Sequence, residues 1–178
     1  MALATLYTIG HSTRSFDELV SALRAHQMET LVDIRAFPMS RRLPQFNRPS
    51  LEQTLPAAGI DYLWMKNLGG YRKKSLPDSP NIALRNKSFR NYADYMLTPE
   101  FERAISELIH VGQHSRTAYM CAERLYFRCH RMLVSDWVVL HGHEVRHIDA
   151  EGPVKPHKAT AEARLIDAQL LYRGDFLL

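Results

Sequence analysis

The chain has 178 residues, of which 46% are hydrophobic and 24% are charged, and it carries a formal net charge of +4. This length and composition predict one globular domain over residues 1–178 and argue against a disordered protein. No apolar run reaches the roughly 18 residues that a membrane helix needs, so we expect no contact with a membrane. Two cysteines are too few for a disulfide framework, which favours a reducing, cytoplasmic location.

Apolar periodicity and capping signals predict strands and helices that alternate along the chain. A strand over residues 6–9 leads to Ser15, which begins a capping-box pattern with Glu18 and a helix that ends near His26. The further predicted strands cover residues 30–34, 61–65, 117–120 and 145–148. The further predicted helices cover residues 49–58, 89–97, 99–110, 126–140 and 159–171, and loops cover 35–48, 67–80 and 155–157. This order predicts an α/β fold, a single three-layer domain with a mostly parallel sheet flanked by helices.

Chemically capable side chains follow the ends of the predicted parallel strands. In strand order they are His11, Ser12 and Arg14; Asp33 and Arg35; Lys66 to Gly70; Cys121 and Glu123; and His147 with Asp149. The carboxyl ends of parallel strands meet at one edge of a sheet, where α/β proteins bind ligands. We therefore expect one cleft there, lined by Cys121, Glu123, His11, Asp33 and Arg35.

The segment from Cys121 to Arg131 places two thiols, a carboxylate, an imidazole and several arginines around one strand-to-helix turn. As a nucleophile, Cys121 would need its pKa lowered by a helix N-terminus or by nearby cations; otherwise it is a small buried hydrophobic residue. A cysteine-phosphatase loop needs five residues between cysteine and arginine. Here six residues separate Cys121 from Arg128, and the loop lacks glycines, which argues against that mechanism.

Metal binding is a further hypothesis, with His11, Cys121, Cys129, His130 and His147 as candidate ligands. The spacing of the two cysteines is not that of a zinc site with paired ligands. Adjacent residues on a helix point about 100° apart, so at most one of Cys129 and His130 is expected to reach Cys121. The sequence therefore names no metal and no cofactor.

Other polar residues have both a functional and a structural interpretation. His11 and Ser12 are a candidate base with a hydroxyl, or a simple turn and cap. Asp33 and Arg35 project to the same side of a strand, and the alternative to a catalytic role is an ion pair that orders the following loop. Glu123 is a candidate acid or base, or the structural partner of a nearby arginine.

The positive charge is concentrated in residues 35–90, which hold eleven Lys/Arg against three acids, a net +8, whereas the remainder holds 12 against 16, a net −4. Aromatic residues are interleaved with these cations, a pattern typical of surfaces that bind single-stranded nucleic acid. The alternative is a solvated basic face over core aromatics. A non-catalytic module of this kind would use Arg41, Arg42, Arg72, Lys73 and Lys74.

Four separated motifs carry a resemblance to a known family. They are Thr8-Ile9-Gly10-His11-Ser12, Leu31-Val32-Asp33-Ile34-Arg35, Cys121-Ala122-Glu123 with Cys129-His130-Arg131, and Pro156-His157. Together they resemble the family catalogued as domain of unknown function 488, from Thr8 to about Ala163. The resemblance implies a small α/β domain with one shared site and names no reaction. Its recurring polar positions match His11, Ser12, Arg14, Asp33, Arg35, Cys121, Glu123, Cys129, His130 and Arg131.

These observations favour an enzyme-like domain that acts on a phosphate-bearing ligand such as a nucleotide or nucleic acid. The predicted catalytic residues are Cys121, Glu123, His11 and Asp33. The predicted ligand-binding residues are Ser12, Arg14, Arg35, Cys129, His130 and Arg131, with Arg14, Arg35 and Arg131 as the anion binders. The alternatives are a non-catalytic nucleic-acid-binding module, or a metal or redox protein that uses Cys121 and Cys129.

Overall fold

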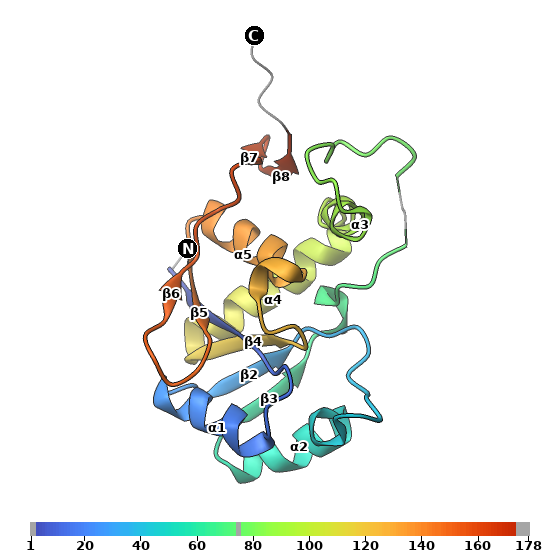
Figure 1. Cartoon of the computed structure of the whole chain (residues 1–178). Coiled ribbons are helices and arrows are strands. Elements are labelled where there is room, and N and C mark those ends of the chain that lie inside the picture. The colour runs from blue at the N-terminus through green and yellow to red at the C-terminus, as the bar shows by residue number, and fades with distance from the viewer. Residues whose placement is uncertain (1–2, 74–75, 174–178) are drawn as a thin grey trace.

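The computed structural model describes residues 3–73 and 76–173, which form a six-stranded sheet, a separate two-stranded sheet and five α-helices (Figure 1). The strands are β1 (Thr5–Gly10), β2 (Thr30–Asp33), β3 (Asp61–Trp64), β4 (Thr117–Cys121), β5 (Glu144–Ile148), β6 (Lys155–Pro156), β7 (Ala163–Ile166) and β8 (Gln169–Tyr172). The helices are α1 (Phe16–Ala25), α2 (Arg48–Ala57), α3 (Lys87–Tyr95), α4 (Pro99–His114) and α5 (Arg131–Leu140).

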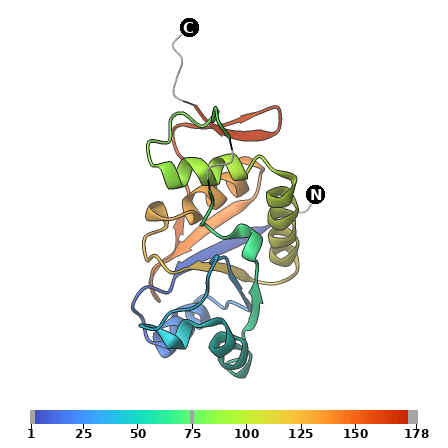
Figure 2. The same ribbon diagram turned by 90° about the vertical axis from the view of Figure 1, so that its right-hand side faces the viewer.

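The large sheet has the strand order β3-β2-β4-β1-β5-β6, and its first five strands are parallel. Helices α1 and α2 cover one face, and α3, α4 and α5 cover the other (Figures 1 and 2). Each face has its own hydrophobic core, one built with α1 and α2 and the other with α3, α4 and α5. The prediction of a three-layer α/β domain with a mostly parallel sheet is therefore confirmed.

The first helix shows how local sequence builds these layers. The hydroxyl of Ser15 accepts a hydrogen bond from the backbone N–H of Glu18 at 3.1 Å, and the carboxylate of Glu18 accepts one from the N–H of Ser15 at 2.6 Å. This reciprocal pair is the predicted capping box, and it satisfies donors that a helix start leaves free. The apolar stripe of Leu19, Val20 and Leu23 is buried beneath the sheet.

The chain leaves neighbouring strands β1 and β4 in opposite directions. After β1 it passes through α1 on one face, and after β4 it passes through α5 on the other (Figure 1). Backbone bonds continue the pairing beyond both strands, from His11 N to Cys121 O at 3.0 Å and from Ser12 N to Ala122 O at 2.9 Å. A β-carbon at Gly10 would overlap the backbone oxygen of Glu123, so only glycine permits this close approach. In open α/β sheets, such a switch of direction is where ligands bind.

The prediction of a helix over residues 159–171 is wrong. The segment forms the antiparallel hairpin β7–β8, and both turn residues, Asp167 and Ala168, have positive φ angles, 50° and 64°. Two left-handed residues are typical of the tight turn that matches the twist of a hairpin. Tertiary contact decides the outcome, because the hairpin buries Leu170 and Tyr172 against the core that includes α5.

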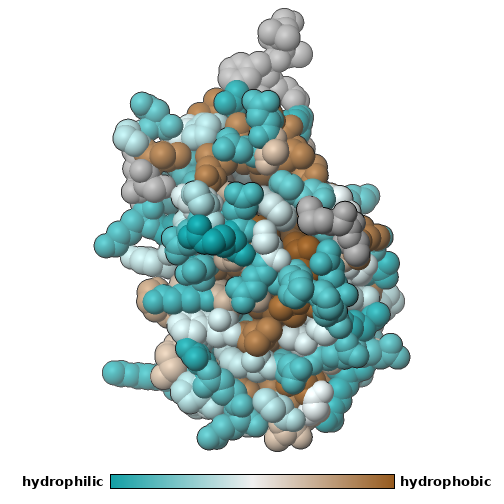
Figure 3. Space-filling model, turned by 180° about the vertical axis from the view of Figure 1, so that it is seen from behind, coloured by the Kyte–Doolittle hydropathy of each residue, from teal (hydrophilic) through white to brown (hydrophobic). Residues whose placement is uncertain are grey.

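Two other boundaries differ from prediction. The segment predicted as one helix over 126–140 begins with a short 3₁₀ helix at Tyr126–Arg128, and α5 starts only at Arg131. The predicted loop at 155–157 contains the short edge strand β6, which pairs antiparallel with β5. No helix among the described residues combines the length and the apolar character needed to cross a membrane. The face shown in Figure 3 is mostly hydrophilic, with hydrophobic residues near the end that carries β7 and β8 and also along the middle of the face.

The buried carboxylate of Asp136 in α5 fastens the C-terminal hairpin to the domain. It accepts hydrogen bonds from the Tyr172 hydroxyl at 2.8 Å and from His157 Nε2 at 2.8 Å. It also accepts from the backbone N–H and the hydroxyl of Thr160, at 2.9 and 2.6 Å. Four donors from three residues therefore depend on one carboxylate that has no exposed surface.

We predict that Asp136→Ala lowers the free energy of unfolding by about 3–5 kcal/mol, because it leaves buried donors without an acceptor. Urea unfolding followed by circular dichroism measures the change. Glu107→Ala, at an exposed position of α4, is the matched control and should change stability by less than about 0.5 kcal/mol. An Asp136→Ala protein as stable as this control would contradict the anchoring role.

Candidate active site at the carboxyl edge of the sheet

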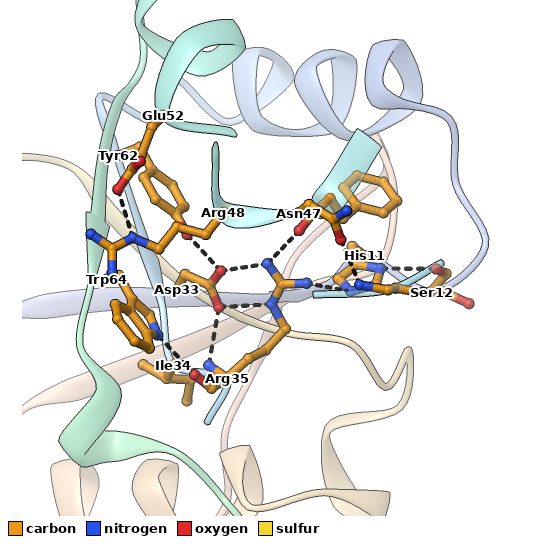
Figure 4. A network of polar contacts seen from close by, with 12 residues as sticks. His11, Ser12, Asp33, Ile34, Arg35, Asn47, Arg48, Glu52, Tyr62 and Trp64 are labelled. Carbon is orange, nitrogen blue, oxygen red and sulfur yellow. Dashed lines mark hydrogen bonds and ion pairs between the residues drawn. The ribbon is translucent and has the colours of Figure 1, made fainter. Parts of the chain in front are cut away.

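Asp33 and Arg35 form a buried ion pair at the end of β2 (Figure 4). Arg35 Nε donates to Asp33 Oδ1 at 2.8 Å, and Arg35 Nη2 donates to the other carboxylate oxygen and to the Phe46 carbonyl at 2.7 Å. The Tyr62 hydroxyl also donates to Asp33, at 2.7 Å. The pair joins β2, β3 and the loop that begins at Arg35, which matches the structural interpretation of these two residues.

His11 joins this network from the end of β1 (Figure 4). Arg35 Nη1 lies 3.3 Å from His11 Nε2, and His11 Nδ1 lies 2.9 Å from the Ser12 carbonyl. This geometry requires a neutral imidazole with its proton on Nδ1. Burial lowers the pKa of His11 to about 4, and the ring stacks on Phe46 with 4.3 Å between centroids. His11 is a predicted base, but both nitrogens of its ring already contact protein groups, Ser12 and Arg35.

Cys121, Cys129 and His130 form a second cluster, whose sulfur and imidazole nitrogen atoms all lie within 4.8 Å of one another. Cys129 ends the 3₁₀ helix and His130 is the N-cap of α5, so the two are not successive positions of one α-helix. The expectation that at most one of them reaches Cys121 is therefore wrong.

The orientation of His130 is set by its backbone surroundings. Its Nε2 lies 3.0 Å from the Ile34 carbonyl, which can only accept, so the proton is on Nε2 and Nδ1 carries a lone pair. That lone pair lies 3.9 Å from Cys121 Sγ. A β-carbon on Gly70 would overlap the His130 ring, so the loop after β3 closes over the imidazole only because this residue is glycine. Burial lowers the pKa of His130, which keeps the ring neutral.

The two thiols share a polarised environment at the N-terminus of α5. Hydrogen bonding from the Cys129 thiol lowers the pKa of Cys121 to about 6. Burial opposes this shift, but backbone N–H groups of Glu123 and Ala122 and the charge of Arg131 support it. The pKa of Cys129 is raised, because Cys129 is the donor to the neighbouring thiolate and is itself buried. A thiolate at a helix N-terminus is also stabilised by the helix dipole.

Arg131 fastens the loop between β4 and α5. The residue is 1% exposed, and its guanidinium donates to Thr8 Oγ1 at 2.8 Å, to the carbonyls of Glu123 and Arg124, and to Cys129 Sγ at 3.3 Å. The side chain of Glu123 is exposed and accepts a long hydrogen bond, 3.4 Å, from the N–H of Leu125. Arg131 therefore binds the backbone of Glu123 and not its carboxylate.

Ser12 and Arg14 lie on the other side of this loop, in a groove of about 700 Å³ that Arg124 and Asp149 also line. Ser12 has a φ angle of 50°, which is uncommon for a residue with a side chain and turns the chain sharply after β1. Arg14 donates to the backbone carbonyls of Gly10 and Asp149. The predicted anion binders Arg14, Arg35 and Arg131 thus all have protein acceptors.

The predicted site residues therefore divide into three adjoining groups. They are the ion pair of Asp33 and Arg35 with His11, the cluster of Cys121, Cys129 and His130 beside Arg131, and the groove with Ser12 and Arg14. Among the described residues, the cysteine–histidine cluster is the one group of three or more potential metal ligands. Its two sulfurs and one nitrogen, with His130 Nε2 held by a carbonyl, are a ligand set that fits zinc with one position left for a non-protein ligand.

Sequence reasoning missed what supports these groups. The Ile34 carbonyl and Gly70 determine how His130 lies, and no periodicity in the sequence signals either contact. Tyr62 lies in the basic half of the sequence, and no pattern there signals that its hydroxyl donates to Asp33. Asp136 escaped notice, and so did its link through His157 to His147, because these contacts join segments far apart in the chain.

Comparison with protein families shows to which family this chain belongs. The profile described as "Domain of unknown function DUF488" matches residues 15–138. The chain belongs to this family. The matched DUF488 segment holds Asp33, Arg35 and the whole cluster from Cys121 to Arg131, whereas His11, Ser12 and Arg14 precede it. Neither the search of curated proteins nor the search of solved structures found a match.

We predict that Arg131→Gln lowers the free energy of unfolding by at least about 2 kcal/mol, because several buried hydrogen bonds to a charged donor are lost. Glu123→Gln should change it by less than about 0.5 kcal/mol, since that carboxylate is exposed. Thermal and urea unfolding of both variants provide the measurement. Equal losses in the two variants would show that Glu123 is part of the scaffold after all.

Proposed function

We propose that the protein is an enzyme that uses the Cys121 thiolate as a nucleophile toward a phosphate-bearing substrate, a nucleotide or nucleic acid. The observation that carries this proposal is the cluster of Cys121, Cys129 and His130. It lies at the carboxyl ends of the paired strands β1 and β4, where the chain leaves toward opposite faces of the sheet. A thiolate is the reactive form of cysteine, and lowered thiol pKa values are typical of nucleophilic sites.

Each residue of the cluster has its own role in this proposal. Cys121 carries the negative charge, and the thiol of Cys129 donates a hydrogen bond to it. When Cys121 is protonated, His130 Nδ1 is an acceptor 3.9 Å from its sulfur. Arg35 and Arg131 add positive charge near the cluster and favour the anionic thiolate. Both cysteines are free thiols, so we further propose a reducing cytoplasmic location, where they stay reduced.

An exposed aromatic pair beside the cluster supports a substrate that carries bases. Phe37 and Tyr71 are 69% and 66% exposed, and their rings meet edge to face with 5.7 Å between centroids. They come from the two loops that enclose His130, because Gly69 packs against Ala36 and Gly70 against His130. Aromatic side chains on a basic surface are typical platforms for nucleobases.

Alkylation kinetics test the nucleophile. We predict that iodoacetamide modifies Cys121 with a rate that rises through a midpoint near pH 6, since the thiolate and not the thiol reacts. Cys129→Ala removes the sulfur donor and should move this midpoint up toward about 8.5, the value of a free cysteine. Mass spectrometry of the modified peptides assigns the site at each pH.

Two controls sharpen this test. Cys121→Ser leaves Cys129 as the remaining thiol. The variant loses the hydrogen bond to the Cys121 thiolate, but burial still raises the pKa of Cys129, which predicts slow modification without a midpoint near pH 6. Metal analysis of the purified protein is the second control, because the same three residues fit a zinc site. A midpoint at pH 8 or above in the unmodified chain, or one zinc ion per chain, would contradict the nucleophile and favour the metal alternative.

A non-catalytic nucleic-acid-binding module is the second candidate, and the exposed Phe37–Tyr71 pair also favours it. Arg41, Arg42 and Lys73 are exposed cations in the same two loops. Arg72 is engaged within the protein, where it lies over the Tyr95 ring at 3.5 Å and donates to backbone carbonyls. Lys74, the fifth predicted cation, lies outside the described residues.

Fluorescence anisotropy with labelled single-stranded DNA measures this second function. We predict binding whose log affinity falls with log salt at about −0.7 per phosphate contacted. Phe37→Ala and Tyr71→Ala should each cost about 1–3 kcal/mol of binding free energy, whereas Ile82→Ala, an exposed apolar residue elsewhere, should cost nothing. Absence of binding at low salt would remove this candidate and leave the thiol chemistry to be judged by alkylation.

A further inference from the structure

The two cysteines of the cluster are close enough to react with each other. Their Sγ atoms lie within 4.8 Å of one another, and the chain contains no other cysteine. A disulfide bond needs the two sulfurs at about 2.05 Å, so an approach of less than about 3 Å would join them. Both residues are partly exposed, which a reaction with a small oxidant requires. Within its own chain, the thiol that an oxidised Cys121 meets is therefore Cys129.

The backbone around the two cysteines allows this approach. Cys129 follows the 3₁₀ helix with extended φ and ψ angles, −141° and 173°, and α5 starts only at Arg131. Cys121 is the last residue of β4. Rotation of the two side chains, with a shift of the loop between them, can therefore bring the sulfurs together without breaking β4 or α5.

The neighbouring side chains favour an attack by the sulfur of Cys129. One ring nitrogen of His130 lies within 4.8 Å of both sulfurs, and Nδ1, which carries the lone pair, lies 3.9 Å from Cys121 Sγ. His130 can therefore accept the proton that Cys129 loses when it attacks. Arg131 Nε donates to Cys129 Sγ at 3.3 Å, and this cation stabilises negative charge on the sulfur as the proton leaves.

We propose that Cys121 and Cys129 are a site of reversible oxidation, at which a hydroperoxide converts the two thiols to an intramolecular disulfide. First, the Cys121 thiolate attacks a peroxide oxygen: an S–O bond forms, the O–O bond breaks, and the leaving hydroxide or alkoxide takes a proton from water. Next, the sulfur of Cys129 attacks the sulfur of Cys121, the S–O bond breaks, and the departing hydroxide leaves as water with the proton of the Cys129 thiol. The two sulfurs together lose two electrons, and the hydroperoxide gains them.

The disulfide would occupy the sulfur that the proposed enzyme uses as its nucleophile. This consequence rests on the proposed function, whereas formation of the bond depends on the two thiols alone. Disulfides of cytoplasmic proteins are typically transient, because cellular thiols reduce them again. Oxidation would therefore switch the site off reversibly and protect Cys121 from irreversible oxidation to the sulfinic acid.

Peptide mass spectrometry after oxidation tests the proposal. The reduced full-length chain is treated with hydrogen peroxide at neutral pH, and the remaining thiols are blocked with iodoacetamide. Trypsin cleaves after Arg124 and Arg128 and so places the two cysteines on separate peptides. We expect the Cys121 peptide linked to the Cys129 peptide as the main product, in a protein that runs as a single chain on a non-reducing gel.

Reduction completes this measurement. Dithiothreitol should release the linked peptides and raise alkylation of Cys121 at least about tenfold over the oxidised chain. Three results would overturn the proposal: two thiols that peroxide leaves unmodified, sulfinic or sulfonic acid at Cys121 without the linked peptide, or disulfides between chains as the main product.

Matched variants assign a role to each sulfur. Cys129→Ser removes the second thiol, so Cys121 should stop at the sulfenic acid, which dimedone traps, and then pass to a sulfinic acid that dithiothreitol does not reduce. At an equal loss of the Cys121 thiol, the unmodified chain should give at least about tenfold less dimedone adduct. Equal labelling of the two proteins would show that Cys129 does not react with the sulfenic acid. Cys121→Ser should consume peroxide at least about tenfold more slowly, and an unchanged rate would contradict Cys121 as the attacking sulfur.

The alkylation kinetics of Cys121 separate this proposal from the proposed function. If the linked peptide does not form but the midpoint lies near pH 6, the nucleophile stands and the disulfide is wrong. If the linked peptide forms but the midpoint lies at pH 8 or above, the disulfide stands and the proposed nucleophile is wrong.

Discussion

The buried guanidinium of Arg131 is the contact on which the carboxyl edge of the sheet depends. It holds the hydroxyl of Thr8 and the carbonyls of Glu123 and Arg124, and so keeps the loop after β4 pressed against the end of β1. The loop can lie there because Gly10 presents no side chain. The same guanidinium donates to Cys129 Sγ and so helps to hold this thiol beside Cys121.

A histidine lies on each side of this arginine, and in both cases hydrogen bonds to one ring nitrogen orient the imidazole. In one, the Ile34 carbonyl holds the proton of His130 on Nε2 and leaves Nδ1 facing Cys121. In the other, Asp136 hydrogen-bonds to His157 Nε2, and His157 Nδ1 hydrogen-bonds to His147 Nε2. These two contacts orient the rings and leave His147 Nδ1 unpaired. Burial lowers the pKa of both His130 and His147, so each ring is a neutral acceptor. A thiol with a lowered pKa and a buried, unpaired imidazole nitrogen therefore lie on the two sides of Arg131.

The parts of the fold that the sequence predicts are those with local signals. The capping box of Ser15 and Glu18 marks the start of α1, and the short apolar run before Asp33 marks β2. The site was predicted as a set of strand ends, and Cys121, Cys129 and His130 do come together. The error about Cys129 and His130 arose because a helix was assumed to run through both, whereas the chain changes from 3₁₀ to α-helix at that point.

By itself the sequence determined the alternation of strands and helices, their parallel order and the edge where the polar residues gather. These features depend on periodicity and capping between residues a few positions apart. Only the tertiary structure decided that residues 163–172 form a hairpin and that Asp136 orients His157 and, through it, His147. It also decided that Arg131 binds the backbone carbonyl of Glu123 and not its carboxylate. Each of these outcomes depends on which donor meets which acceptor across the fold, and on burial that only the packed chain creates.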